Sequence, residues 1–120
     1  MAKAVGFGGI FLKARDPKTL KAWYAEHLGI PNGPGGLEFS GPESAGTTLF
    51  AHFPSGSDYF GADTQQAMVN FRVDDLDALL KQLAEAGVRV DEKRDEYDFG
   101  KFGWIWDPEG NKVELWEVKD

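Results

Sequence analysis

The chain has 120 residues, 42% of them hydrophobic, and a formal net charge of −7. This length and composition indicate one globular domain with its own core. An acidic chain without a stripe of Lys and Arg argues against nucleic-acid binding. The absence of cysteine excludes disulfides, thiolate metal sites and a cysteine nucleophile, and it fits a cytoplasmic protein. No run approaches the roughly 18 apolar residues of a membrane span, so no membrane partner is expected.

The first half of the chain begins with a strand and a helix. Ala4–Leu12 is apolar and predicts a strand rather than a signal peptide, because Lys13-Ala14-Arg15-Asp16 follows it instead of a small-residue cleavage site. Asp16-Pro17 then supplies an acidic N-cap and a proline at the first helical position. The apolar stripe of this helix consists of Leu20, Trp23, Tyr24, His27 and Leu28. We expect Trp23 in the core and His27 in a structural role near the helix end.

A second helix follows Asp74-Asp75 and repeats the first. Its apolar face is formed by Leu76, Leu79, Leu80 and Leu83. Sliding the chain by about half its length lays Ala14-Arg15-Asp16 on Val73-Asp74-Asp75 and Leu20 on Leu79. A repeat of half the chain indicates a duplicated module.

The remaining apolar segments predict strands. These are Leu37–Ser40, Thr47–Phe53, Val88–Asp91, Tyr97–Trp106 (broken at its glycines) and Lys112–Val118, with a further strand beginning near Met68. Pro31–Gly36 is predicted to be a loop, and the charged stretch Asp91–Asp98 a solvated edge strand or loop. Each half is therefore a strand, a helix and two or three strands.

Three segments carry a resemblance to a known family. They are Gly9–Ile30, Met68–Val90 and the closing Trp104–Glu117, whose aromatic–x–Asp-Pro-x-Gly-Asn–x–x–Glu-Leu pattern is the most specific. They resemble the vicinal oxygen chelate superfamily of glyoxalases, bleomycin-resistance proteins and extradiol dioxygenases. The resemblance implies an α+β fold of two tandem βαβββ modules, about 1–60 and 64–120, in one domain over 1–120. It also implies curved mixed sheets around a cavity, helices on the outside and a homodimer.

The resemblance also bears on metal binding. Glyoxalase-like relatives usually hold one divalent metal with four side chains. In this chain Gly9 and Met68 stand at two of these positions, Phe50 or His52 at the third, and only Glu114 keeps the usual residue. The sequence therefore assigns no cofactor. A divalent metal on His52 and Glu114, a catalytic proton transfer by this pair, and a merely structural role for both stay open.

Strand alternation predicts which side chains line the cavity, because residues two apart share a face. The predicted ligand-binding residues are Lys13, Phe50, Met68, Asn70, Arg72, Trp104, Trp106 and Trp116. Lys13 and Arg72 could hold an anionic ligand or pair with nearby carboxylates at the surface. The three tryptophans could stack on a planar ligand or form a core or dimer seam.

Together these observations predict a small-molecule-binding protein of the glyoxalase and bleomycin-resistance type without the usual metal site. The alternative is a glyoxalase-like, metal-dependent lyase or isomerase that acts on an oxygen-rich substrate through His52 and Glu114. A structural or regulatory dimer module is a third hypothesis. Whether the protein is an enzyme stays open at this point.

Overall fold

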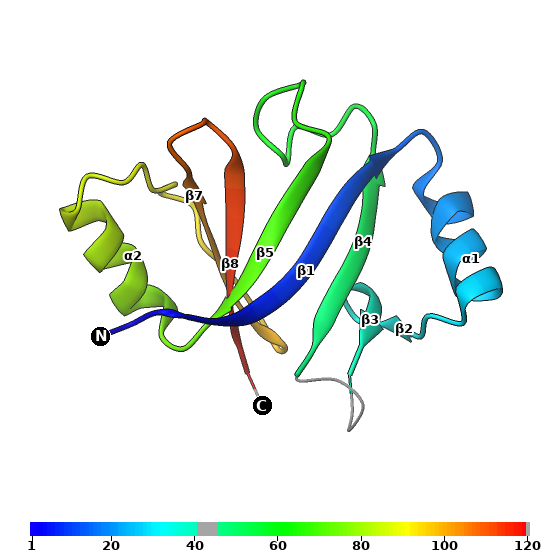
Figure 1. The fold of residues 1–120 in the computed structure, drawn as a ribbon, viewed down its shortest axis with the longest axis horizontal. Helices are drawn as coiled ribbons and strands as arrows, with labels where there is room; N and C mark the ends of the chain where they lie inside the picture. Colours follow the sequence, from blue (N-terminus) through cyan, green and yellow to red (C-terminus); the bar gives the residue numbers. More distant parts are fainter. Residues whose placement is uncertain (41–45, 120) are drawn as a thin grey trace. The chain divides into compact units, whose positions relative to one another are not determined.

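The structure, a computed structural model, describes residues 1–40 and 46–119 (Figure 1). Contacts within the chain divide it into two compact units. We call Gly9–Met68 the N-terminal unit, and Met1–Gly8 with Val69–Asp120 the C-terminal unit. The first strand, β1 (Ala4–Ala14), begins in the C-terminal unit and ends in the N-terminal unit.

The N-terminal unit holds one helix and the strands that follow it. These elements are α1 (Pro17–Leu28), β2 (Asn32–Gly33), β3 (Gly36–Phe39) and β4 (Thr48–Pro54). The strands are hydrogen-bonded in the order β2-β3-β4-β1. Strand β4 lies parallel to β1 and antiparallel to β3, which in turn is antiparallel to β2.

The C-terminal unit repeats this arrangement. Its elements are β5 (Ala67–Val73), α2 (Leu76–Glu85), β6 (Asp95–Tyr97), β7 (Gly100–Trp106) and β8 (Lys112–Val118). Their order is β1-β5-β8-β7-β6, with β8 parallel to β5 and antiparallel to β7. The eight strands are thus hydrogen-bonded into one mixed sheet, and β1 pairs with strands of both units. The predicted α+β fold of two tandem βαβββ modules is confirmed.

Helix α2 supplies the core of the C-terminal unit. It contacts β7 and β8, and its residues Leu76, Leu79 and Leu80 are buried against Val73 and Leu115. Each fully buried leucine contributes roughly 1.5–3 kcal/mol to folding. This leucine face, visible in the sequence, therefore fixes α2 on the sheet.

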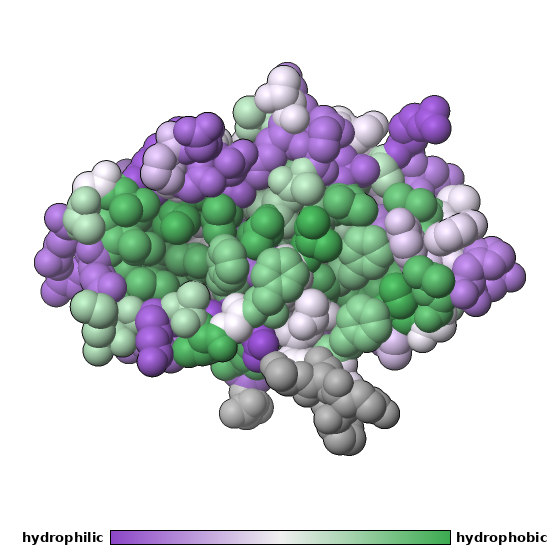
Figure 2. Space-filling view, viewed as in Figure 1, coloured by the Kyte–Doolittle hydropathy of each residue, from purple (hydrophilic) through white to green (hydrophobic). Residues whose placement is uncertain are grey.

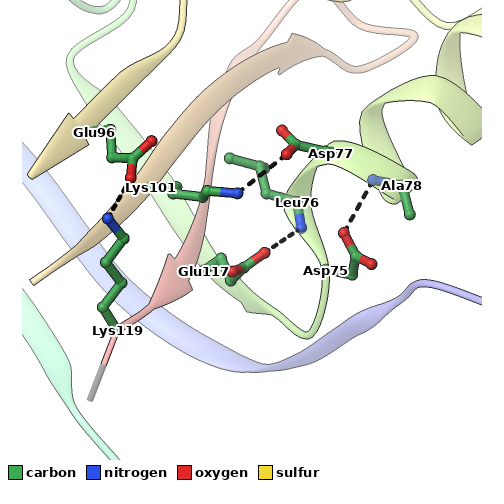
Figure 3. A network of polar contacts seen from close by, with 8 residues as sticks. All are labelled: Asp75, Leu76, Asp77, Ala78, Glu96, Lys101, Glu117 and Lys119. Carbon is green, nitrogen blue, oxygen red and sulfur yellow. Dashed lines mark hydrogen bonds and ion pairs between the residues drawn. The ribbon is translucent and has the colours of Figure 1, made fainter.

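Polar contacts fix the first turn of α2 (Figure 3). Asp75 caps the helix by accepting from the Ala78 amide at 3.1 Å. Glu117 of β8 accepts from the Leu76 amide at 2.8 Å, and Lys101 of β7 pairs with Asp77 at 3.1 Å. The hydrogen bond and charge of Asp77 raise the pKa of Lys101. The start of α2 is thereby tied to both strands beneath it.

Helix α1 is packed differently. Asp16 caps it, accepting from the Thr19 amide at 3.1 Å and from the Thr19 hydroxyl at 2.8 Å, and none of the helix residues is buried. Trp23 is 50% exposed, so its predicted core position is wrong; His27 is exposed as well. Helix α1 packs on β4, and the Trp23 ring lies against Tyr24 and His27 of the same helix rather than inside a core.

Three further predictions concern short segments between the main strands and helices. Val88–Asp91 is not a strand: its one bridge joins Val90 to Ile105. Pro31–Gly36 was expected to be a loop, yet it contains β2. The charged stretch does supply an edge strand, β6. In the described part of the chain neither helix has the length and apolar character needed to cross a membrane.

Candidate functional site

Strand pairing in the C-terminal unit decides which side chains share a face. Asn70 of β5 pairs with Glu114 of β8, which in turn pairs with Trp104 of β7. Paired residues point to the same side of a sheet. The residues brought to this face include Asn70, Arg72, Phe102, Trp104, Trp106, Lys112, Glu114 and Trp116. We call it the Glu114 face; Leu115 and Val73 point the other way, into the α2 core.

Glu114 lies at the centre of this face and is almost completely buried, with 1% of its surface exposed. Its Oε2 accepts from the Asn70 side-chain amide at 2.5 Å, and its Oε1 accepts from the Trp104 indole at 3.0 Å. Asn70 and Trp104 are buried too. A buried carboxylate requires such hydrogen bonds, because an unsatisfied polar group in the interior is costly. Both oxygens are therefore engaged by neutral donors of the same unit.

Asn70 reaches Glu114 because β1 leaves room for it. A Cβ on Gly8 would lie 1.7 Å from the Asn70 Oδ1 atom, a distance that no side chain could tolerate. This Oδ1 is buried, and no partner for it is found among the described residues. Asn70 therefore keeps one unused acceptor beside the carboxylate.

The other polar and aromatic members of the face also have partners. The Arg72 side chain lies over Gly6, and its Nε donates to the Phe7 carbonyl at 3.4 Å. Trp116 stacks on Phe102 with the ring planes 10° apart. The Trp106 ring carries the Arg89 guanidinium 3.9 Å above it. Arg72, Trp106 and Lys112 are half-buried, so solvent still reaches these members of the face.

His52 belongs to a different cluster, in the N-terminal unit. Register pairs Leu12 with His52 and Phe11 with Ala51, so His52 and Phe50 lie on the opposite face of β4 from Phe11. The Tyr24 ring of α1 stacks on the His52 ring, with the ring centroids 5.5 Å apart. It also packs edge to face with the Phe50 ring, with the centroids 4.7 Å apart. The expectation that Phe50 lines the same face as Lys13 is therefore wrong, because the register pairs Lys13 with Phe53 and turns Phe50 and His52 to the other side, where Tyr24 of α1 covers them.

The His52 imidazole is unusual in its surroundings. Both ring nitrogens are buried, and no hydrogen-bond partner for either is found among the described residues. Burial, with a smaller contribution from the positive charge of Lys21, lowers the pKa of His52. The structure groups His52 with aromatic rings and Glu114 with Asn70 and Trp104, each within its own unit.

The expected metal positions do not fit a divalent ion. A Cβ on Gly9 would lie 1.9 Å from the Leu49 carbonyl oxygen, so no side chain can stand there. Met68 is fully buried and offers only a thioether, a poor ligand for hard divalent ions. No group of three or more His, Cys, Asp or Glu suitable for a metal is found in residues 1–40 and 46–119. The donor set of this chain therefore departs from that of metal-binding relatives.

A groove lies in the N-terminal unit, where β1 ends and α1 begins. Its volume is about 750 Å³. The lining residues are Lys13, Ala14, Arg15, Asp16, Thr19, Leu20, Trp23, Ser55 and Gln66. The sequence pointed to Lys13 but missed Arg15 and Trp23. The charged segment Lys13-Ala14-Arg15-Asp16 was the signal in the sequence that could have indicated this groove. Trp23 was missed because the apolar pattern of its helix predicted it in the core.

A smaller cavity, of about 270 Å³, lies in the C-terminal unit beside the network of Figure 3. Leu76, Asp77, Lys101 and Phe102 contribute to its lining. Of its charged groups, Asp77 pairs with Lys101, Glu96 with Lys119 and Asp95 with Lys93, while Arg94 donates to two backbone carbonyls. This cavity therefore accompanies the anchoring of α2.

The chain belongs to the glyoxalase-like domain family, whose model matches residues 9–116. No curated protein matches it in sequence. Methylmalonyl-CoA epimerase from Mycobacterium tuberculosis is similar over 98% of this chain and 90% of that chain, with 22% identity and a TM-score of 0.68.

Two other solved structures are similar in fold. A Streptomyces coelicolor methylmalonyl-CoA epimerase variant in complex with 2-nitronate-propionyl-CoA has 13% identity and a TM-score of 0.76 over 98% of this chain and all (100%) of that chain. The Mn(II)-bound glyoxalase from Novosphingobium aromaticivorans has 15% identity and a TM-score of 0.67 over 100% of this chain and 43% of that chain. These likenesses show the fold alone. The predicted vicinal oxygen chelate superfamily is confirmed.

Proposed function

We propose that this protein binds a small organic molecule at the Glu114 face without a metal ion. The observation that carries the proposal is the set of groups around Glu114: its oxygens accept from the neutral donors of Asn70 and Trp104, and the expected partner positions are Gly9 and Met68. A divalent ion on Glu114 would need several further ligands around it. The positions of Gly9 and Met68 supply none.

The ligand would meet the half-buried members of the face first. Trp106 offers an aromatic surface and Arg72 a cation, a combination of apolar walls with few polar groups that suits small molecules. Lys13 and Met68, which the sequence also proposes as ligand-binding residues, belong to the N-terminal unit and not to this face of the C-terminal unit. Phe50 is not kept, because its ring packs against Tyr24.

The test combines metal analysis with a binding titration. The purified protein should contain much less than one metal ion per chain, and its tryptophan fluorescence should be quenched saturably by an aromatic ligand before and after chelation. Trp106→Leu should weaken this binding, while the exposed Glu109→Gln variant should bind as wild type does. Stoichiometric metal that is lost in Glu114→Ala would contradict the proposal.

The same experiment separates the other hypotheses. A metal-dependent lyase or isomerase using His52 and Glu114 would lose its metal both in His52→Ala and in Glu114→Ala. A structural or regulatory module would bind neither metal nor any aromatic ligand in the panel. One epimerase of this fold is in complex with 2-nitronate-propionyl-CoA, which supports small-molecule binding under both the first proposal and the enzyme hypothesis.

We further propose that the protein is a cytoplasmic homodimer. Val5, Phe7 and Phe71 of the C-terminal unit are 52%, 48% and 37% exposed, and the rings of Phe7 and Phe71 are 6.0 Å apart. Figure 2 shows hydrophobic residues gathered over the region of β5 and α2 on the face in view. Exposed apolar patches of this kind mark protein contacts.

Sedimentation analysis tests the homodimer. We expect a dimer that Phe7→Ser converts to a monomer, because the substitution places a hydroxyl at the centre of the apolar cluster. Leu28→Ser, which changes an exposed leucine of the N-terminal unit, is the control and should stay dimeric. A wild-type chain that stays monomeric at all concentrations would overturn the homodimer. The cytoplasmic location rests on the absence of cysteine.

A further inference from the structure

The groove beside α1 has the size of a ligand site. Its volume of about 750 Å³ is within the range of roughly 300–1,000 Å³ found for small-molecule pockets. Ala14, at the end of β1, forms part of its lining, and Thr19, Leu20 and Trp23 of α1 form another. All of these residues lie in the N-terminal unit, so the groove is formed within one compact part of the chain.

Arg15 is the cation that this groove can offer to a ligand. It is exposed, and neither a hydrogen bond nor an ion pair to its guanidinium is found in the described part of the chain. Its neighbour Asp16 does not pair with it, because both Asp16 oxygens accept hydrogen bonds from Thr19. The Lys13 ammonium is committed elsewhere, to the Asp63 carbonyl at 3.4 Å and the Phe60 ring at 5.3 Å.

Trp23 supplies a planar apolar wall. Its indole is 50% exposed although it belongs to the apolar stripe of α1. The Tyr24 ring meets it edge-on, with the planes 83° apart and the centroids 5.1 Å apart. An exposed indole face gains stability when a second planar ring covers it, through burial of apolar area and stacking.

These features point to one class of ligand. A free guanidinium binds a carboxylate through two parallel hydrogen bonds, a geometry that Lys cannot reproduce. The Asp16 carboxylate also lines the groove and would repel a second negative charge on the ligand. We propose that the groove between the end of β1 and α1 binds a planar aromatic monocarboxylate, whose carboxylate pairs with Arg15 and whose ring stacks on Trp23.

The test uses naphthoate as the probe and naphthamide, its neutral amide, as the matched probe without charge. Calorimetric titration of the wild-type protein should give saturable binding of naphthoate and binding of naphthamide about tenfold weaker or more, because a hydrogen bond to a charged partner contributes about 1.5–3 kcal/mol. Arg15→Gln should weaken naphthoate binding by a similar factor. Lys18→Gln is the control, because it also removes one positive charge close to the start of α1, at a residue outside the groove lining.

Amide and indole NMR resonances locate the binding. Naphthoate should shift the signals of Trp23 and Thr19, and Trp23→Leu should weaken binding while the remaining spectrum stays that of the folded protein. Absence of saturable binding, equal affinity for naphthamide, or equal losses in Arg15→Gln and Lys18→Gln would each overturn the proposal.

Two further outcomes have a clear meaning. Shifts confined to Trp104 and Asn70 would overturn the groove site while supporting the proposed function at the Glu114 face. Shifts of Trp23 that follow protein concentration without ligand would show that a second copy covers the groove, which also overturns the proposal.

Discussion

At the scale of single residues, the site depends on glycines as much as on polar groups. Gly8 admits Asn70 beside β1, and Asn70 in turn holds Glu114. Gly9 has a φ of +138°, and its hydrogen faces the Leu49 carbonyl where β1 meets β4. At the position where metal-binding relatives carry a ligand side chain, this chain therefore requires glycine.

Replacing Gly9 with alanine tests this requirement. We expect Gly9→Ala to lower the free energy of unfolding by more than about 2 kcal/mol, because the new Cβ would overlap the Leu49 carbonyl and require an unfavourable φ. Gly56→Ala is the matched control, since nothing lies within 4 Å of its added Cβ, and it should change the value by less than about 0.5 kcal/mol. Urea denaturation measures both; equal effects would refute the explanation.

His52 should make the stability depend on pH. Burial lowers the pKa of His52 in the folded protein below the ordinary value of about 6.5, so the unfolded chain takes up the proton more readily. The contribution of His52 is therefore complete above about pH 6.5 and is lost as the pH falls from there towards the lowered folded pKa. The groups facing the imidazole are Tyr24 and Phe50, with Lys21 adding positive charge.

His52→Phe should flatten the pH profile of stability between about pH 5 and 7, because the phenyl ring cannot take up a proton. Urea midpoints measured at several pH values provide the comparison. His27→Phe, at an exposed position of α1, should keep the wild-type profile. Parallel profiles of wild type and His52→Phe would show that burial does not control this histidine.

The sequence predicted part of the site at this scale. Alternation placed Asn70, Arg72, Glu114 and Trp116 on one face, and the strand register agrees. It grouped Phe50 with Lys13 because it could not supply the register of β4 against β1, and a shift of one residue exchanges the two faces of a strand. The hydrogen bonds of Glu114 depend on three strands meeting, which no local pattern encodes.

At the scale of elements, the two helices have the same position in their modules but different packing. Both were predicted from their caps and stripes. α2 buries Leu76, Leu79 and Leu80, whereas α1 carries Trp23, Tyr24 and His27 on its stripe and buries none of its residues. Periodicity shows which residues share a helix face but not how much sheet surface covers that face, so the exposure of Trp23 could not be predicted.

Hydrogen exchange should show this difference. A helix opens locally when few buried contacts hold it, so α1 amides should exchange much faster than α2 amides. Asp16→Ala removes the cap that bonds Thr19 and should accelerate exchange several-fold in α1, leaving β7 and β8 unchanged. Protection of α1 equal to that of α2 would show that an additional contact, such as a partner, covers the helix.

At the scale of the whole molecule, duplication explains most of what the sequence could predict. Two matched halves fixed the order of strand, helix and strands in each module, and the structure repeats the same pairing pattern in both. The short strands β2 and β6 were misplaced or bounded differently, because they are edge strands of two and three residues with little apolar pattern. The fold was thus more predictable than the site.

The central claim is that a glyoxalase-like fold here holds a hydrogen-bonded carboxylate in place of a metal ligand. The most direct measurement is the NMR signal of the Trp104 indole during titration with Mn²⁺, since its nitrogen lies 3.0 Å from Glu114 Oε1 and any ion bound there would broaden it. We expect the indole signal of Trp104 and the side-chain amide of Asn70 to stay sharp at one equivalent of Mn²⁺. Their loss at one equivalent, with recovery in Glu114→Gln, would contradict the account.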